Sequence, residues 1–295
     1  MRPIKVAAGV LNQTPLAWDQ NTKNILDAIQ LAREADVAIL CLPEQCIPGY
    51  GCEDAFHAPF VRETSLQILQ EIAPYTRDII VCVGLPILYR NGLFNAAALL
   101  VDGEIVGLVP KRFLAGDGLH YEPRWFKPWP KDEQGTVQIG GRSVPIGDIY
   151  FDCGGIRLGF EVCEDAWVAE RPGAVLARKG VDVILNPSAS HFAFGKLDVR
   201  KRFVLEGARA FAVTYIYSNL LGNDSGRVIY DGGGLVASGG DLLAVGPRFG
   251  YGDVDLTIAT TDVARTRMIQ ARTGSFRPSF EDEAEELVKV AFSYP

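Results

Sequence analysis

Residues 37–42 read VAILCL, an unbroken run of apolar side chains. A short run without polar alternation is typical of a strand that is buried on both faces, as in parallel sheets. Upstream, residues 19–35 carry apolar side chains at helical spacing, and residues 4–10, IKVAAGV, form another strand-like run. The sequence therefore predicts a strand–helix–strand unit, the unit from which parallel sheets are built.

The same order recurs later in the chain. Residues 181–186 (VDVILN) and 215–220 (YIYSNL) are strand-like, and the segment between them has helical spacing. Two apolar runs joined by Asp102-Gly103 predict a β-hairpin, and the run DIIVCVG and short runs after residue 227 predict further strands. These patterns together predict an α/β protein with mixed parallel and antiparallel pairing.

Composition limits the classes of function. With 295 residues, 48% of them hydrophobic, the chain can bury a substantial core. A formal charge of −7 argues against nucleic acid or an anionic membrane as the main partner. No apolar run reaches 18 residues and the start lacks a signal-peptide pattern, so we expect a soluble cytoplasmic protein. Since no stretch resembles a linker, we expect one domain over residues 1–295, with an acidic helix or arm at 269–295.

The cysteines do not form a recognisable metal or disulfide pattern. There is no CxxC pair, and neither cysteines nor the three histidines are spaced as metal ligands, so a metal-binding protein is disfavoured. We expect most of the cysteines to be reduced and buried. The six are Cys41, Cys46, Cys52, Cys82, Cys153 and Cys163.

Three polar residues follow strand-like runs. Glu44 comes after VAILCLP, Lys111 after EIVGLVP and Cys163 after IRLGFEV. Open α/β sheets place their chemistry just beyond the carboxyl ends of strands, so a fold of this kind can bring the three residues together. Taken singly, each has a simpler interpretation, as a surface carboxylate, a solvated ammonium and a buried thiol.

Together, these residue types form a set for amide hydrolysis without histidine. A thiol reacts as its thiolate, and CEDAW predicts a helix that starts at Cys163 and lowers the pKa of the thiol. A carboxylate beside the thiol acts as general base, and a lysine ammonium stabilises an oxyanion. We expect Glu44, buried beside Lys111, to keep its charge through pairing with the ammonium.

Longer motifs surround these residues. They are LPEQCIPGYGCEDAF at 42–56, PKRFLAGDGLHYEPRWFKPW at 110–129 and FEVCEDAW at 160–167, with NPSASHF at 186–192. In this order the motifs resemble the carbon–nitrogen hydrolase (nitrilase) superfamily, over nearly the whole chain. More narrowly, they and RNGLFNAAALL at 90–100 are similar to the N-terminal glutaminase domain of glutamine-dependent NAD synthetases.

The resemblance implies a four-layer αββα sandwich of the nitrilase type, usually assembled into oligomers. It implies Glu44 as general base, Lys111 as oxyanion stabiliser and Cys163 as nucleophile, without metal or organic cofactor. A second glutamate of the family matches Glu122, which would hold Lys111 or the amide in place. A surface salt bridge is the alternative interpretation of Glu122.

Three more residues match positions that border the substrate in the family, and two aromatic residues of the same motifs are candidates for the walls of the pocket. Glu164, Ser188 and Ser190 would meet the ammonium and carboxylate of glutamine, whereas Tyr50 and Trp125 would line the pocket. The alternatives are helix and loop capping for the first three and plain packing for the two aromatic residues.

The implied substrate is a small carboxamide, above all the side-chain amide of glutamine, hydrolysed to glutamate and ammonia for NAD synthesis. SGGDL at 238–242 lacks the following serine of a synthetase phosphate loop and is typical of a tight turn. We therefore expect a free-standing relative, a separate subunit or an excised domain, with an NAD synthetase domain or subunit accepting the ammonia. The alternatives are a stand-alone amidase, an N-carbamoyl amino acid hydrolase, or a catalytically silent interaction subunit.

Overall fold

The computed structural model describes residues 3–224, 227–280 and 286–295 of the chain. The described residues form sixteen strands in two sheets, joined by β11 (Thr214–Asp224), which pairs with strands of both. The first sheet contains β1 (Pro3–Asn12), β2 (Ile39–Cys41), β3 (Ile80–Tyr89), β4 (Gly92–Val101), β5 (Glu104–Pro110), β6 (Gln134–Ile139), β7 (Arg142–Gly147), β12 (Val228–Asp231) and β15 (Val254–Asp262). The second contains β8 (Tyr150–Cys153), β9 (Ile156–Phe160), β10 (Val183–Ser188), β13 (Leu235–Ser238), β14 (Asp241–Val245) and β16 (Leu287–Val290).

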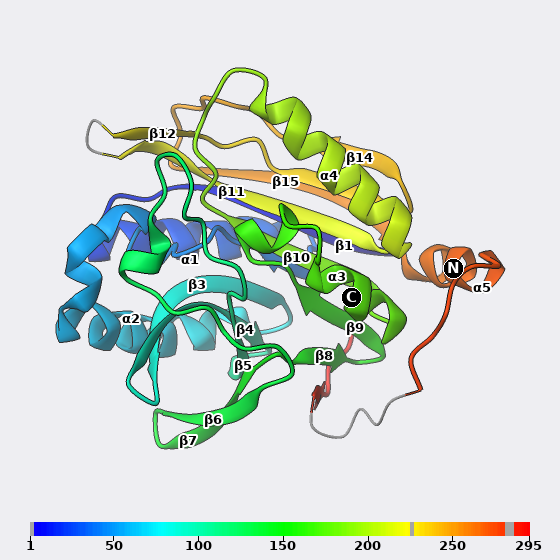
Figure 1. The fold of residues 1–295 in the computed structure, drawn as a ribbon, viewed down its shortest axis with the longest axis horizontal. Coiled ribbons are helices and arrows are strands. Elements are labelled where there is room, and N and C mark those ends of the chain that lie inside the picture. The colour runs from blue at the N-terminus through cyan, green and yellow to red at the C-terminus, as the bar shows by residue number, and fades with distance from the viewer. Residues whose placement is uncertain (1–2, 225–226, 281–285) are drawn as a thin grey trace.

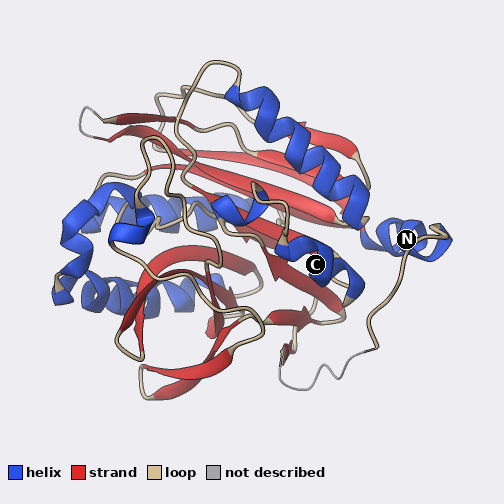
Figure 2. Cartoon of the chain, viewed as in Figure 1, coloured by secondary structure: helices blue, strands red, loops and turns tan. Residues whose placement is uncertain are grey.

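Helices cover the outer faces of the two sheets (Figures 1 and 2). The first sheet packs against α1 (Trp18–Glu34) and α2 (Pro59–Ile72), and the second against α3 (Pro172–Arg178) and α4 (Lys196–Phe211). A fifth helix, α5 (Val263–Arg272), follows β15, and short 3₁₀ turns occupy Tyr50–His57, Ala73–Thr76, Glu122–Arg124 and Cys163–Ala166.

Strand alternation explains the layers. In β1, Ala7 and Leu11 belong to the core shared with α1 and α2, whereas Val6 and Ala8 belong to the core between the two sheets. Successive side chains of a strand point to opposite faces, so one strand fills two cores. A third core joins the second sheet to α3 and α4. The predicted four-layer αββα sandwich is confirmed.

The strand directions decide where polar side chains gather. Strand β2 is parallel to β1, β1 to β11, β11 to β10, and β10 to β9. Strand β3 is parallel to β2, and β5 runs in the same direction because β4 is antiparallel to both β3 and β5. The carboxyl ends of β2, β5, β9 and β10 therefore point the same way.

Several local predictions are confirmed, among them both strand–helix–strand units and the β4–β5 hairpin, with Asp102 and Gly103 at positive φ. SGGDL forms the β13–β14 turn, in which Ser238 pairs with Asp241. The predicted helix start at Cys163 is wrong. Only one 3₁₀ turn forms there, and the next helix, α3, begins at Pro172.

The C-terminal segment differs in part from the predicted helix or arm at 269–295. Helix α5 begins at Val263, before residue 269, because the Asp262 side chain accepts a hydrogen bond from the Ala264 N–H and caps it. Strand β16 then pairs in parallel with β8. Most of the acidic stretch, residues 281–285, lies outside the described residues.

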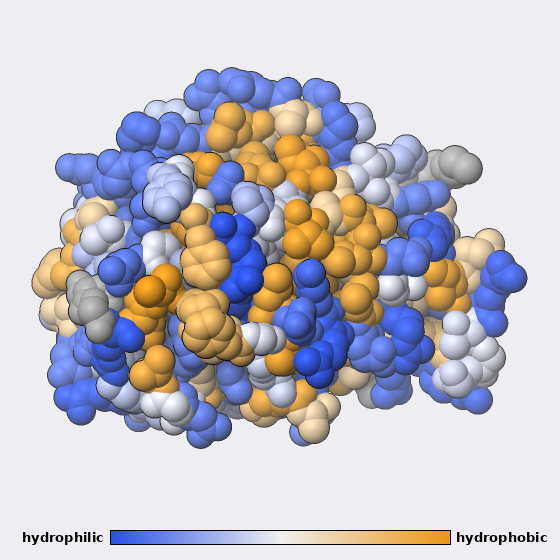
Figure 3. Space-filling model, turned by 90° about the horizontal axis from the view of Figure 1, so that it is seen from above, coloured by the Kyte–Doolittle hydropathy of each residue, from blue (hydrophilic) through white to orange (hydrophobic). Residues whose placement is uncertain are grey.

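The surface is mixed in polarity. Figure 3 looks onto the upper side of Figure 1, where α4 begins, and shows areas of apolar residues separated by hydrophilic ones. Large exposed apolar side chains include Phe194, Phe249 and Tyr251. Among the helices of the described residues, none combines the length and the apolar character needed to cross a membrane.

Candidate active site

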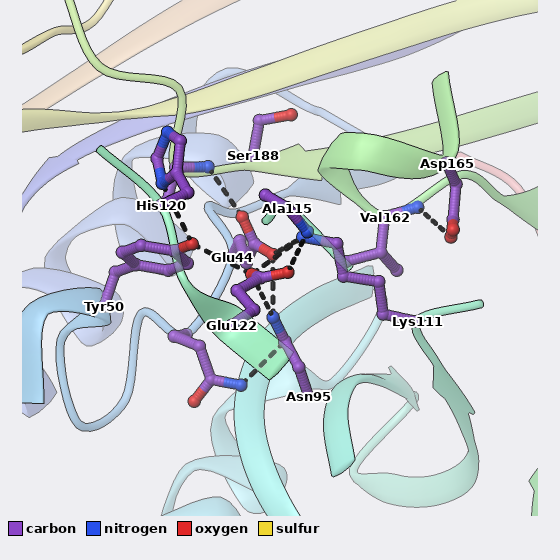
Figure 4. Close-up of polar contacts among 12 residues, drawn as sticks. Glu44, Tyr50, Asn95, Lys111, Ala115, His120, Glu122, Val162, Asp165 and Ser188 are labelled. Atoms are coloured by element: carbon purple, nitrogen blue, oxygen red, sulfur yellow. Dashed lines mark hydrogen bonds and ion pairs between the residues drawn. The ribbon is translucent and has the colours of Figure 1, made fainter. Parts of the chain in front are cut away.

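Glu44, Lys111 and Cys163 lie at one end of the sandwich because the strands before them point the same way. Glu44 follows β2, Lys111 directly follows β5, and Cys163 opens the 3₁₀ turn after β9. Lys111 Nζ donates a hydrogen bond of 2.7 Å to Glu44 Oε1 (Figure 4). The Cys163 thiol and the Glu44 carboxylate lie close enough for each to affect the pKa of the other. The three segments that carry the predicted catalytic residues thus meet in one place.

A second carboxylate shares the same ammonium. Lys111 Nζ donates to Glu122 Oε1 at 2.8 Å, so the alternative interpretation of Glu122 as a surface salt bridge does not describe its position. The side chains of Lys111, Glu44 and Glu122 have no exposed surface. Asn95, in β4, adds hydrogen bonds of 2.7 Å to Glu44 Oε1 and 3.2 Å to Glu122 Oε1.

The two carboxylates differ in their other hydrogen-bond donors. Glu122 also accepts from the Ala115 N–H at 2.7 Å and the Tyr50 hydroxyl at 2.9 Å. Burial would raise the pKa of Glu122, but the charge of Lys111 and these donors lower it below its usual value. Glu122 is therefore the carboxylate that pairs with Lys111 in the ionised form.

The protonation state of Glu44 differs from the prediction that pairing with Lys111 keeps its carboxylate charged. Burial raises its pKa to about 7, the charge of Lys111 acts against this, and the nearby charge of Glu122 raises it further. One ammonium cannot fully offset two buried negative charges, so near neutral pH Glu44 is in part protonated. The pKa of Lys111 lies well above its usual value because the two glutamates outweigh the effect of burial.

Cys163 is held in a strained backbone conformation beside this network. Its φ is +46°, in the left-handed region that side chains other than glycine rarely adopt. Burial, and then the charge of Glu44, raise the pKa of the thiol, so the thiol is protonated at rest. The Ala189 N–H, just after β10, donates to Glu44 Oε2 at 2.9 Å and also lowers the pKa of the nearby thiol. The sulfur therefore lies near both the Glu44 carboxylate and a backbone N–H group.

Two further residues hold these segments in place. Gly84 lies in β3, where a Cβ atom would come within 2.2 Å of the Gln45 nitrogen, so only glycine allows the Glu44 loop to approach. Asp165 accepts hydrogen bonds from the Phe113 N–H at 2.8 Å and the Val162 N–H at 2.9 Å. It thereby joins the loop after Lys111 to the turn that carries Cys163.

The predicted substrate-binding residues fall into two groups. Tyr50 and Trp125 line a small cleft of about 30 Å³, and Glu164 is half-buried next to Cys163. The hydroxyls of both serines are buried and bonded within the protein: Ser188 Oγ donates to Asn186 Oδ1 at 2.9 Å, and Ser190 Oγ accepts from Arg200 Nε at 3.3 Å. Their predicted contact with substrate stays a prediction.

A comparison with protein families matches residues 5–272 to the carbon–nitrogen hydrolase model. The chain belongs to the carbon–nitrogen hydrolase family. The predicted superfamily and the prediction of an amide-hydrolysing enzyme are confirmed at this level. In the described part of this carbon–nitrogen hydrolase, no group of three or more His, Cys, Asp or Glu residues is placed to hold a metal ion.

Comparisons with individual proteins add detail to the family assignment of this carbon–nitrogen hydrolase. The glutamine-dependent NAD(+) synthetase of Mus musculus is 33% identical over 285 residues, which cover 93% of this chain and 39% of that protein. A crystal structure of a glutamine-dependent NAD(+) synthetase from Cytophaga hutchinsonii matches with a TM-score of 0.83 and 43% identity, over 88% of this chain and 43% of that one. The chain thus spans about two-fifths of the length of these relatives.

The fold also matches a shorter enzyme. A double mutant of the amidase from Nesterenkonia sp. AN1, solved in complex with acrylamide, has a TM-score of 0.70 at 22% identity and covers 92% of this chain and 94% of its own. At this identity the match concerns the fold of the carbon–nitrogen hydrolase alone.

Sequence reasoning missed Asn95 and Asp165. The signal for Asn95 was a lone amide within the apolar strand LFNAAALLV, because a buried polar side chain needs partners. The signal for Asp165 was weaker, since an acid after CE was attributed to a helix start. No pattern in the sequence indicated that Asp165 would bind the loop after Lys111.

Proposed function

We propose that this carbon–nitrogen hydrolase converts the side-chain amide of glutamine to glutamate and ammonia, with Cys163 as nucleophile. The observation that carries the proposal is the buried ion pair of Lys111 with Glu44, beside which the Cys163 thiol lies close enough to affect the pKa of Glu44. Base, cation and nucleophile are the groups that amide hydrolysis through a thioester needs. Similarity to glutamine-dependent NAD(+) synthetases supports glutamine as the amide.

In the first half of the reaction, Glu44 takes the proton from Cys163 and the thiolate adds to the amide carbon. The negative charge that forms on the amide oxygen is stabilised by Lys111 and by the backbone N–H that follows Cys163. Glu44 then returns the proton to the nitrogen, the carbon–nitrogen bond breaks, and ammonia leaves a thioester on the sulfur.

In the second half, Glu44 takes a proton from water and the hydroxide adds to the thioester carbon. The carbon–sulfur bond breaks, glutamate leaves, and the proton returns to the sulfur. Glu122 keeps Lys111 in position and charged throughout, because its carboxylate accepts from Lys111, Ala115 and Tyr50 and remains ionised.

The ammonia has an expected acceptor. Because the relatives that share this region are glutamine-dependent NAD(+) synthetases, we propose an NAD synthetase domain or subunit as the recipient. We also propose a cytoplasmic homo-oligomer, and the exposed apolar areas on the face in Figure 3 provide surface for subunit contacts.

The proposal is tested by ammonia release from glutamine, butanamide and an N-carbamoyl amino acid, in the wild type and in Cys163→Ala. Glutamine should give the highest kcat/KM, and Cys163→Ala should be inactive while remaining folded. The matched control Cys153→Ala removes a buried thiol from the core between the sheets and should retain activity. Preference for the N-carbamoyl substrate or for butanamide identifies the alternative amidase, and absence of turnover on all three identifies an interaction subunit.

A further inference from the structure

Arg200, in α4, has the largest fully buried side chain of the described residues, and it takes no part in the proposed reaction steps. Its Nη1 donates a hydrogen bond of 2.7 Å to Oδ1 of Asp231, which is buried in β12. The other oxygen of Asp231 accepts from Arg248 Nε at 2.8 Å. A buried ion pair of this kind seldom adds more stability than apolar side chains of equal volume, whereas it does fix the backbone groups to which it is bonded.

The remaining donors of Arg200 bind the segment that follows β10. Nη2 donates to the Ser190 carbonyl oxygen at 2.7 Å and to the His191 carbonyl oxygen at 2.8 Å, and Nε donates to Ser190 Oγ at 3.3 Å. Asn219, in β11, accepts from the Ser190 N–H at 2.8 Å and donates to the Ser190 carbonyl oxygen at 3.1 Å. The backbone of Ser190 is therefore held at both its N–H and its carbonyl group by buried side chains.

This segment also contacts the proposed base. Ala189, the residue before Ser190, donates its N–H to Glu44 Oε2 at 2.9 Å. The other oxygen of Glu44 accepts from Lys111 and Asn95. Since Ser190 is fixed by Arg200 and Asn219, the position of the Ala189 N–H depends on them, and with it the position of Glu44 Oε2.

Resting on the proposed function, we propose that Arg200 and Asp231 are positioning residues of the reaction, which act through Ser190 to keep the Ala189 N–H on the Glu44 carboxylate. A hydrogen bond to the ionised form of a carboxyl group favours that form and lowers its pKa. The Ala189 N–H thereby acts against burial, which raises the pKa of Glu44 to about 7. Without Arg200 the pKa of Glu44 should rise further, so that the base is ionised only at higher pH.

The charged groups around Glu44 and Arg200 decide which substitution is informative. Arg200→Met removes a positive charge as well as the hydrogen bonds, so it mixes two effects. Arg200→Lys keeps the charge, but an ammonium cannot reproduce the planar fork that reaches two carbonyl oxygens and a carboxylate. The titratable groups that act on Glu44 include Lys111, Glu122, Cys163 and Tyr50, and those around Arg200 include Asp231, Tyr217, His191, Lys196 and Cys163.

The experiment measures kcat/KM for glutamine between pH 5 and 9, together with unfolding in urea. In Arg200→Lys we expect the midpoint of the pH profile to rise by about one pH unit. The rate at pH 6 should therefore fall about tenfold, whereas at pH 9 it should return to within about threefold of the wild type. Asp231→Asn should shift the midpoint in the same direction by a smaller amount. Arg202→Lys, at an exposed position of the same helix, is the matched control and should keep the wild-type midpoint.

The outcomes separate positioning from a purely structural role. Lower stability and a lower rate at every pH, with an unmoved or lowered midpoint in Arg200→Lys, would make Arg200 a structural residue and overturn the inference. If Arg200→Lys does not fold, Asp231→Asn decides by the same criterion.

Failure of the glutaminase proposal would be recognised separately. If the wild type releases no ammonia from glutamine, the pH dependence of Cys163 alkylation by iodoacetamide, followed by intact mass, takes the place of the assay. A higher midpoint in Arg200→Lys than in Arg202→Lys would then support the positioning role without glutamine as the substrate. Equal midpoints would overturn it.

Discussion

Lys111 donates hydrogen bonds of 2.7 Å to Glu44 and 2.8 Å to Glu122, so one buried ammonium serves two carboxylates. Glu122 has the better set of additional donors and is the ionised partner. Burial raises the pKa of Glu44 to about 7, and the Cys163 thiol lies close enough to affect it. This inequality between two glutamates on one lysine supports the proposed role of Glu44 as a base near neutral pH.

The pH dependence follows from Glu44. Its carboxyl pKa is raised to about 7, and the base is the deprotonated form, so activity is present above that pH and lost below it. We expect kcat/KM for glutamine to rise with pH through a midpoint near 7. Steady-state kinetics between pH 5 and 9 measure this, and a rate that is flat down to pH 5 contradicts it.

Replacing Glu122 should move that midpoint. The charge of Glu122 raises the pKa of Glu44, so Glu122→Gln should lower the midpoint by about one to two pH units. The maximal rate should also fall, because Lys111 loses its ionised partner. Glu133→Gln, at an exposed position, is the control and should leave the profile unchanged. An unmoved or raised midpoint in Glu122→Gln means that the two carboxylates are not coupled in this way.

A methyl group at residue 84 should displace the base. In Gly84→Ala the new Cβ would meet the Gln45 nitrogen at 2.2 Å and the Glu44 carbonyl carbon at 2.9 Å, and both are backbone atoms that cannot move aside freely. We expect kcat to fall at least tenfold, with destabilisation of about 1–3 kcal/mol. Gly274→Ala has no atom within 4 Å of its Cβ and should be neutral. Wild-type kcat in Gly84→Ala would show that the Glu44 loop tolerates displacement.

Loss of the Asp165 hydrogen bonds should lower both the stability and the activity of the protein. Asp165→Asn replaces an acceptor that faces the N–H groups of Phe113 and Val162 by an amide with a single acceptor oxygen. Urea unfolding should show a loss of about 1–3 kcal/mol, and kcat should fall as the Lys111 loop and the Cys163 turn separate. Asp78→Asn, at an exposed site, should change neither. Reduced stability with unchanged kcat would limit Asp165 to a structural role.

The sequence placed the three candidate catalytic residues at strand ends, but it did not predict the side chains that surround them. Glu44, Lys111 and Cys163 each follow an apolar run, and strand direction alone brings such positions to one end of the sandwich. The partners could not be predicted, because Asn95 meets Glu44 only through the pairing of separate strands. The helix predicted at Cys163 did not form, although the Asp165 carboxylate accepts from the Val162 N–H as in a helix start, and the φ of Cys163, +46°, lies outside the helical region.

In the C-terminal region, too, the sequence predicted local elements better than their pairing with distant strands. The run VDLTIATTDV at 254–263 forms a strand, as predicted, but β15 ends at Asp262, which caps α5. Strand β16 gains its partner from β8, more than a hundred residues earlier, and a pattern confined to the C-terminal residues carries no information about such a pairing.

Intact-mass analysis after incubation with 6-diazo-5-oxonorleucine tests the central claim most directly, because this glutamine mimic alkylates a nucleophile that acts on the glutamine amide. We expect one adduct per chain in the wild type and in Cys153→Ala, located by peptide mapping at Cys163, and none in Cys163→Ala. An adduct at another cysteine, or an unlabelled wild-type chain, would contradict the assignment of Cys163 as the nucleophile of a glutaminase.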